Sequence, residues 1–238
     1  MHNKISHSIV IVGMVKKVTK AVGLFSEAVS PIYHVWAWIL LIWTVYRYFF
    51  RLPEWVDEFI VKPCIFVLPV AWYVIKKEKR RLDSVGVTGK NFFTSLYIGI
   101  GFGLVFALEG ILAHFLKYKN LSVNPISAFS DYGFGLIIIS LATACSEEFL
   151  CRGFLFNRIL EKTRKLVPST VVGAVLFILL HIPMILMVNK LQGVTLVIFF
   201  LTDFILAAAN SMLYETTGSL VAPILVHLFW NMTVALYL

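Results

Sequence analysis

The chain has 238 residues, of which 59% are hydrophobic and only 14% are charged, and its mean hydropathy is +0.85. A soluble domain carries about 25% charged residues, so this composition excludes an ordinary soluble globule and predicts an integral, multi-pass membrane protein. The formal net charge of +8 does not indicate a nucleic-acid partner, because the basic residues lie between apolar runs and form no stripe with interleaved aromatic residues.

Apolar segments long enough to cross a membrane recur along the chain. A helix needs roughly 20 apolar residues to cross about 30 Å of hydrocarbon. The segments that come close to this length are residues 32–50, 58–75, 92–116, 132–157, 168–188, 193–214 and 219–238. The second segment is interrupted by Lys62, Pro63 and Pro69 and is the weakest of the set. Residues 8–30 contain several lysines, and we expect them to form an interfacial amphipathic helix or an eighth element.

The predicted fold is therefore all-α, a polytopic transmembrane helical bundle of about seven to eight spans. No internal repeat or linker divides the chain, so residues 1–238 are predicted to form a single integral membrane domain. Gly99 and Gly103 form a GxxxG pattern on the third segment, which is typical of closely packed membrane helices.

The positions of the basic residues predict the orientation in the membrane. The chain has 21 lysines and arginines. With a cytoplasmic N-terminus, 14 of them fall in cytoplasmic segments and 6, including Lys62, in outer segments, while Arg152 lies inside a span. Because cytoplasmic loops carry the excess of positive charge, we expect the N-terminus to be cytoplasmic.

Polar residues inside the predicted spans are the candidate functional residues, because such residues are costly in a membrane. They concentrate in the last four spans, so we expect residues 1–130 to supply N-terminal transmembrane helices and residues 131–238 a catalytic core. The polar residues within spans are Glu109, Glu147, Glu148, Arg152, His181, Asp203, Asn210, His227 and Asn231.

Helical spacing separates the two adjacent glutamates. Glu148 and Arg152 are four residues apart, so they share a helix face and are expected to form an ion pair that supports the site. Glu147 points about 100° away on the same helix, so it needs a different partner.

The remaining polar residues lie at similar predicted depths. At about 1.5 Å per residue, Glu147, His181, His227 and Asn231 lie about 12 to 20 Å from the cytoplasmic ends of three helices. A carboxylate, two imidazoles and an amide in one layer can supply a general base and donors to an oxyanion. No serine or cysteine has a sequence signature of activation, so this set predicts that water hydrolyses an acyl bond, and a site within the membrane favours proteolysis.

Three short motifs carry a resemblance to a known family. "EEFLCR" (Glu147 to Arg152) fits EExxxR, "FILLH" (Phe177 to His181) fits FxxxH, and "HLFWN" (His227 to Asn231) fits HxxxN. In order and spacing they resemble the CPBP (Abi) family of intramembrane proteases, which includes the CAAX-prenyl endopeptidases and bacteriocin-processing proteins. The resemblance covers about residues 136–238.

The resemblance implies a role for each motif residue. Glu147 would activate water together with His181, whereas His227 and Asn231 would form the oxyanion hole. Glu148 and Arg152 would support the first motif. Cys151 stands where the family often has phenylalanine, which changes packing rather than chemistry.

The resemblance leaves the cofactor open. Glu147, His181 and His227 are a set of two histidines and one carboxylate that a divalent metal such as zinc could use. A metal-free mechanism, in which the glutamate activates water, uses the same residues, and the sequence does not decide between the two. We slightly favour a site without a tightly bound structural metal. The expected partners are membrane lipid and a peptide or protein substrate in or at the membrane.

Two other classes of function compete with the protease. A non-catalytic membrane protein of the bacteriocin-immunity type could have the same fold and retain these residues for binding. A small proton-coupled transporter could use Glu147 and His181 as a proton relay, although the inverted halves common in transporters are not visible in the sequence.

Overall fold

The computed structural model describes residues 29–120, 125–189 and 191–237. Within these ranges the chain forms helices and turns without a strand, which confirms the all-α prediction. Residues 8–30 were predicted to form an interfacial helix or an eighth element, and all but the last two of them lie outside the described residues. The helices in chain order are α2 (Ser30–Phe49), α3 (Glu54–Val56), η2 (Asp57–Val61), η3 (Pro63–Val67), α4 (Leu68–Trp72), η4 (Tyr73–Lys77), η5 (Leu82–Val85), α5 (Phe92–Tyr118), α6 (Pro125–Glu148), η6 (Phe149–Phe156), α7 (Asn157–Thr163), α8 (Leu166–Met184), η7 (Ile185–Asn189), α9 (Gly193–Thr217) and α10 (Val221–Tyr237).

Five helices of the described chain are long and apolar enough to cross a membrane. They are Glu54–Lys77, Phe92–Leu116, Phe134–Thr163, Leu166–Met187 and Gly193–Thr217, and a shorter apolar helix covers Val221–Ala235. Helix α2 has 20 residues but is not one of the five, since it is rich in tryptophan and tyrosine. The chain is therefore a multi-helix integral membrane protein, and the prediction of seven to eight spans is not confirmed.

The second span is an unbroken helix, although the sequence made it the weakest of the set. It runs from Glu54 to Lys77 through several turns of the wider π-helical form. Proline lacks an N–H and crowds the preceding turn, and wide turns accommodate such local disruption without ending a helix. Lys62 lies in the middle of this helix and is only 6% exposed, so its assignment to an outer segment was wrong.

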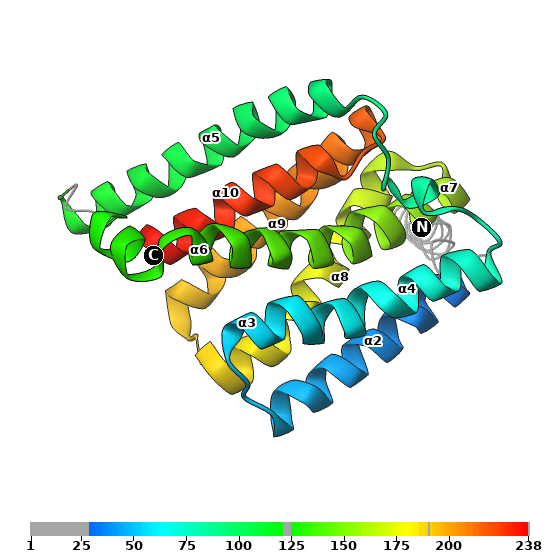
Figure 1. Ribbon diagram of the computed structural model, residues 1–238, viewed down its shortest axis with the longest axis horizontal. Helices are drawn as coiled ribbons and strands as arrows, with labels where there is room; N and C mark the ends of the chain where they lie inside the picture. Colours follow the sequence, from blue (N-terminus) through cyan, green and yellow to red (C-terminus); the bar gives the residue numbers. More distant parts are fainter. Residues whose placement is uncertain (1–28, 121–124, 190, 238) are drawn as a thin grey trace, which may run out of the picture.

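The helices pack side by side, with α5 at one side of the molecule and α2 at the other (Figure 1). Helix α10 packs against α5, α6 and α9, while α8 packs against both α9 and α2. Helix α10 therefore lies among α5, α6 and α9, and α8 links it through α9 to the N-terminal helices.

The α5–α10 contact confirms the close packing predicted from the GxxxG pattern. A side-chain carbon added at Gly99 would lie 2.9 Å from Leu225, and one added at Gly103 would collide with the ring of Phe229. Both glycines therefore allow α10 to approach α5 directly. This contact holds the helix that carries His227.

Charged residues join two segments at one end of the bundle. Arg80 donates two hydrogen bonds to Glu161, at 2.8 and 3.0 Å, and Arg158 forms a 2.8 Å ion pair with Glu78. The basic segments that follow the second span and precede α8 therefore lie at the same end of the molecule. The charge distribution had placed both on one side of the membrane.

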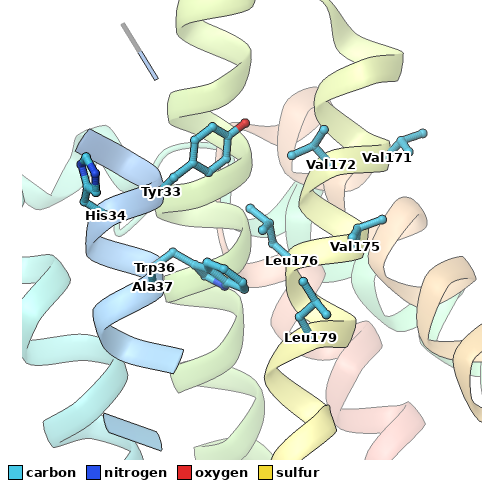
Figure 2. Close-up of a pocket in the computed structure, with 9 residues that line it drawn as sticks. All are labelled: Tyr33, His34, Trp36, Ala37, Val171, Val172, Val175, Leu176 and Leu179. Carbon is cyan, nitrogen blue, oxygen red and sulfur yellow. The ribbon is translucent and has the colours of Figure 1, made fainter. Parts of the chain in front are cut away.

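An apolar cavity of about 490 Å³ lies between α2 and α8 (Figure 2). Its lining residues are Tyr33, His34, Trp36, Ala37, Val171, Val172, Val175, Leu176 and Leu179. None of them belongs to the polar set singled out in the sequence. The cavity is therefore separate from the candidate site, although α8 contributes to both.

Candidate active site

The candidate site forms where helix α6 ends. Glu147 and Glu148 are the last two residues of α6, and the π-helical segment η6 follows them directly. Wide turns of this kind often occur at functional sites. His181 comes from α8 and His227 from α10, so three helices bring together side chains that the sequence predicted to share one layer.

Glu147 lies between the two histidines. Its Oε2 atom is 3.8 Å from Nε2 of His181 and 3.7 Å from Nε2 of His227. Oε2 is buried and has no hydrogen-bond partner within the described ranges, which is unusual because buried polar atoms are normally paired. An oxygen and two ring nitrogens thus converge on a small polar space.

The other oxygen of Glu147 is held by a residue that the sequence analysis did not assign to the site. Nζ of Lys62 donates a 2.8 Å hydrogen bond to Oε1 of Glu147 and lies 2.8 Å from Oε2 of Glu58. The signal was an opposite-charge pair four residues apart within an apolar run, the same signal that identified Glu148 and Arg152. The sequence analysis instead took Lys62, together with Pro63 and Pro69, as an interruption of the second span.

Glu148 is buried, and one of its oxygens is hydrogen-bonded to two neighbours and forms an ion pair with a third. Its Oε1 lies 3.1 Å from Nη1 of Arg152, which confirms the predicted ion pair. The same oxygen lies 2.7 Å from Nδ1 of His227 and accepts a 3.0 Å hydrogen bond from Nδ2 of Asn210. Arg152 also lies over the ring of Phe177, 4.4 Å from its centroid. Glu148 therefore orients the ring of His227 through Nδ1, while Glu147 faces Nε2 of both His181 and His227.

The neighbours of His181 suggest how its ring is protonated. Nδ1 lies 3.1 Å from the carbonyl oxygen of Phe177, which can only accept a hydrogen bond. In the neutral ring Nδ1 then carries the proton, and Nε2 is an acceptor directed at Glu147. Asp203, on α9, lies 3.7 Å from Nδ1 and is 4% exposed, so it is a second group beside that proton.

The protonation of His227 is constrained by its contact with Glu148. Nδ1 donates to the carboxylate of Glu148 at 2.7 Å, which leaves Nε2 as an acceptor in a neutral ring. To donate from Nε2 as well, the ring must carry two protons. The role of hydrogen-bond donor to an oxyanion therefore requires the imidazolium form of His227.

The other polar residues that the sequence analysis placed inside spans lie at different distances from Glu147 and the two histidines. The amide nitrogen of Asn231 is buried without a partner among the described residues, one helical turn beyond His227 on α10. Asn210 enters the site through Glu148 and also donates to the carbonyl of Pro223 at 3.2 Å. Glu109 is exposed on α5 and is not part of the cluster.

The proposed metal ligands do not fit a metal centre as they are arranged. Among the described residues, no group of three or more His, Cys, Asp or Glu side chains is placed to hold a metal ion. Zinc bonds of about 2.0–2.1 Å would bring tetrahedral ligand atoms to about 3.4 Å from one another, closer than the Glu147–histidine distances. The ammonium group of Lys62, 2.8 Å from Oε1 of Glu147, would also repel a metal cation bound to that carboxylate.

The site is reached most easily beside His181. The side chain of His181 is 22% exposed, compared with 8% for Glu147 and 3% for His227. A substrate group would therefore approach Glu147 from the α8 side. The helix that carries His181 is fixed to α2 by Trp43, whose ring nitrogen donates to the carbonyl of Leu180 at 3.2 Å.

Comparison with known proteins supports the resemblance seen in the motifs. Residues 130–233 match the Rce1-like family, described as type II CAAX prenyl endopeptidase Rce1-like. No curated protein and no solved structure matches the chain. The matched segment contains all three motifs and supports assignment to the CPBP/CAAX protease family, whereas Lys62 lies outside it.

Proposed function

Because residues 130–233 match the family of Rce1-like CAAX endopeptidases, we propose that this protein is an intramembrane endopeptidase. It hydrolyses a peptide bond in a protein or peptide that is in or at the membrane. The observation that carries the proposal is the position of Oε2 of Glu147, which is buried, has no hydrogen-bond partner among the described residues, and lies 3.7–3.8 Å from the Nε2 atoms of two histidines on other helices.

Glu147 and His181 activate the attacking water. Both Oε2 of Glu147 and Nε2 of the neutral His181 ring are acceptors, so one water molecule can donate a hydrogen bond to each at about 2.8 Å. As the water oxygen bonds to the carbonyl carbon of the substrate, one proton passes to Glu147, with His181 sharing it. The tetrahedral intermediate then collapses, the C–N bond breaks, and the proton passes to the leaving amine.

His227 and Asn231 stabilise the oxyanion of that intermediate. The amide nitrogen of Asn231 has a free donor in the described part of the chain, and a doubly protonated His227 donates from Nε2 while Glu148 holds Nδ1. Preorganised donors of this kind stabilise developing negative charge strongly in a buried site. No step in this mechanism passes through a metal ion.

The test is cleavage of fluorogenic peptides that end in a CAAX sequence, with and without a prenyl group, by protein purified in detergent. We expect the wild type to cleave at least one of them, and E147Q and H181A to lose about 100- to 10,000-fold in rate. E161Q and H34A are matched controls, because they change a glutamate and a histidine away from the site, and we expect both to cleave like the wild type.

Several results would overturn parts of this proposal. Unchanged cleavage by E147Q would remove Glu147 as the base. Loss of activity on chelation, with recovery on adding zinc, would replace the metal-free mechanism with a metal-dependent one. Proton-coupled uptake in liposomes without cleavage of any peptide would favour the transporter.

A further inference from the structure

Lys62 is a buried cation in direct contact with the carboxylate of Glu147. It lies in the middle of the second span, where its side chain is only 8% exposed. Charged residues at such positions are usually paired and often functional. Lys62 also lies outside residues 130–233, the part of the chain that matches a known family.

Lys62 belongs to a cluster of four side chains from two helices, in which Thr143, Glu58, Lys62 and Glu147 contact one another in that order. Its Nζ lies 2.8 Å from both Oε1 of Glu147 and Oε2 of Glu58. Oε2 of Glu58 also accepts a 2.7 Å hydrogen bond from Oγ1 of Thr143. Glu58 and Lys62 are four residues apart on one helix, and so are Thr143 and Glu147 on the other, so each pair lies on a single helix face.

This arrangement decides which oxygen of Glu147 is available. Lys62 occupies Oε1, and Oε2 is left facing Nε2 of His181 and of His227. Without Lys62, Glu58 and Glu147 would both lose the cation that they share. A buried charge that loses its partner is strongly destabilised, and Glu147 would be free to turn.

We propose that Lys62, held by Glu58 and Thr143, is a positioning residue that fixes the carboxylate of Glu147 in its working orientation. This role rests on the proposed hydrolytic function of Glu147. It makes the second span part of the catalytic unit, and it assigns Glu58 and Thr143 the task of anchoring the lysine.

The test compares K62M, K62R and E58Q with R47M as a matched control. Arg47 also forms a buried ion pair with a carboxylate of the second span, at 2.5 Å from Asp57, but does not contact Glu147. We expect K62M to lower kcat about 100-fold, the size of effect that a misplaced catalytic group produces, with little change in KM. We expect K62R to recover most of this loss, E58Q to lose about 10-fold, and R47M to retain the wild-type kcat per folded molecule.

A second measurement does not depend on cleavage. The difference between the infrared spectra of the wild type and E147Q isolates the carboxylate stretching band of Glu147. We expect this band to shift in K62M, measured against K62M/E147Q, and to return toward the wild-type position in K62R.

The outcomes separate the two proposals. If no peptide is cleaved but the band shifts as expected, the proposed hydrolytic function is wrong. The contact between Lys62 and Glu147 is then purely electrostatic, and the positioning role is overturned with the function. An unshifted band overturns that role whatever the activity. Equal losses of kcat in K62M and R47M would show that Lys62 has only a structural role. A higher kcat in K62M than in the wild type would show that Lys62 inhibits the reaction.

Discussion

At the scale of single residues, the two adjacent glutamates have different surroundings and therefore different chemistry. Glu148 is fully buried, and one of its oxygens is shared by Arg152, His227 and Asn210. Glu147 gives one oxygen to Lys62, and its other oxygen faces Nε2 of His181 and Nε2 of His227. Each glutamate has one oxygen without a hydrogen-bond partner among the described residues, so the difference lies in what that oxygen faces. Glu148 is thus suited to orienting a histidine, whereas Glu147 is suited to accepting a proton.

The amide of Asn231 provides a residue-scale prediction. We expect N231A to lower kcat about 100- to 1,000-fold with little change in KM, because a donor to the oxyanion acts only in the transition state. The matched control is N91A, since Asn91 donates to the carbonyl of Thr217 at 3.1 Å and does not contact the site. Peptide cleavage kinetics measure both, and equal kcat values for the two variants would exclude Asn231 from the oxyanion hole.

At the scale of helices, local irregularity and close packing place the side chains of the candidate site. The π-helical turns of the second span accommodate Pro63 while keeping Lys62 on the face toward α6. Another wide segment begins directly after Glu148. On the opposite side of the bundle, Gly103 lets α10 approach α5, so the position of His227 depends on a glycine that has no polar role.

The α5–α10 contact provides an element-scale prediction. We expect G103A to destabilise the protein by about 1–3 kcal/mol, because the added methyl group collides with the ring of Phe229 and overpacks the helix contact. G101A is the matched control on the same helix, since nothing lies within 4 Å of a carbon added there.

Both substitutions gain the same helix propensity from alanine, so their difference isolates the packing effect. Thermal unfolding in detergent measures it. Equal stability of G103A and G101A would show that the two helices adjust without cost.

At the scale of the whole molecule, the N-terminal helices contribute contacts to the candidate site as well as to the helical bundle. Lys62 comes from the second span, and α2 packs on the helix that carries His181. Residues 131–238 therefore hold all the motifs but not all the contacts that position them.

The orientation in the membrane is a prediction at this scale. In a chain whose native cysteines are replaced, we expect N120C to react with an impermeant maleimide on intact cells and K79C to react only after permeabilisation. The reason is that Lys79 follows the second span within the basic cluster, whereas Asn120 follows the far end of α5. The reverse labelling pattern would place the N-terminus outside.

The sequence by itself determined the features that depend on local spacing. Composition and apolar run length are enough to predict an all-α membrane bundle, and a spacing of four residues is enough to predict the Glu148–Arg152 pair, because both follow from helix geometry. The three motifs identified Glu147, His181 and His227, and the fold brings Oε2 of Glu147 within 3.8 Å of Nε2 of each histidine.

Only the tertiary structure decided which side chains face each other across helices. Lys62 meets Glu147 from 85 positions away in the chain, Asn210 joins Glu148 from 62 positions away, and Glu109 stays outside the cluster. Spacing along one helix carries no information about the rotation and register of another helix packed against it. The pairing of Lys62 with the candidate base therefore became visible only once the helices were assembled.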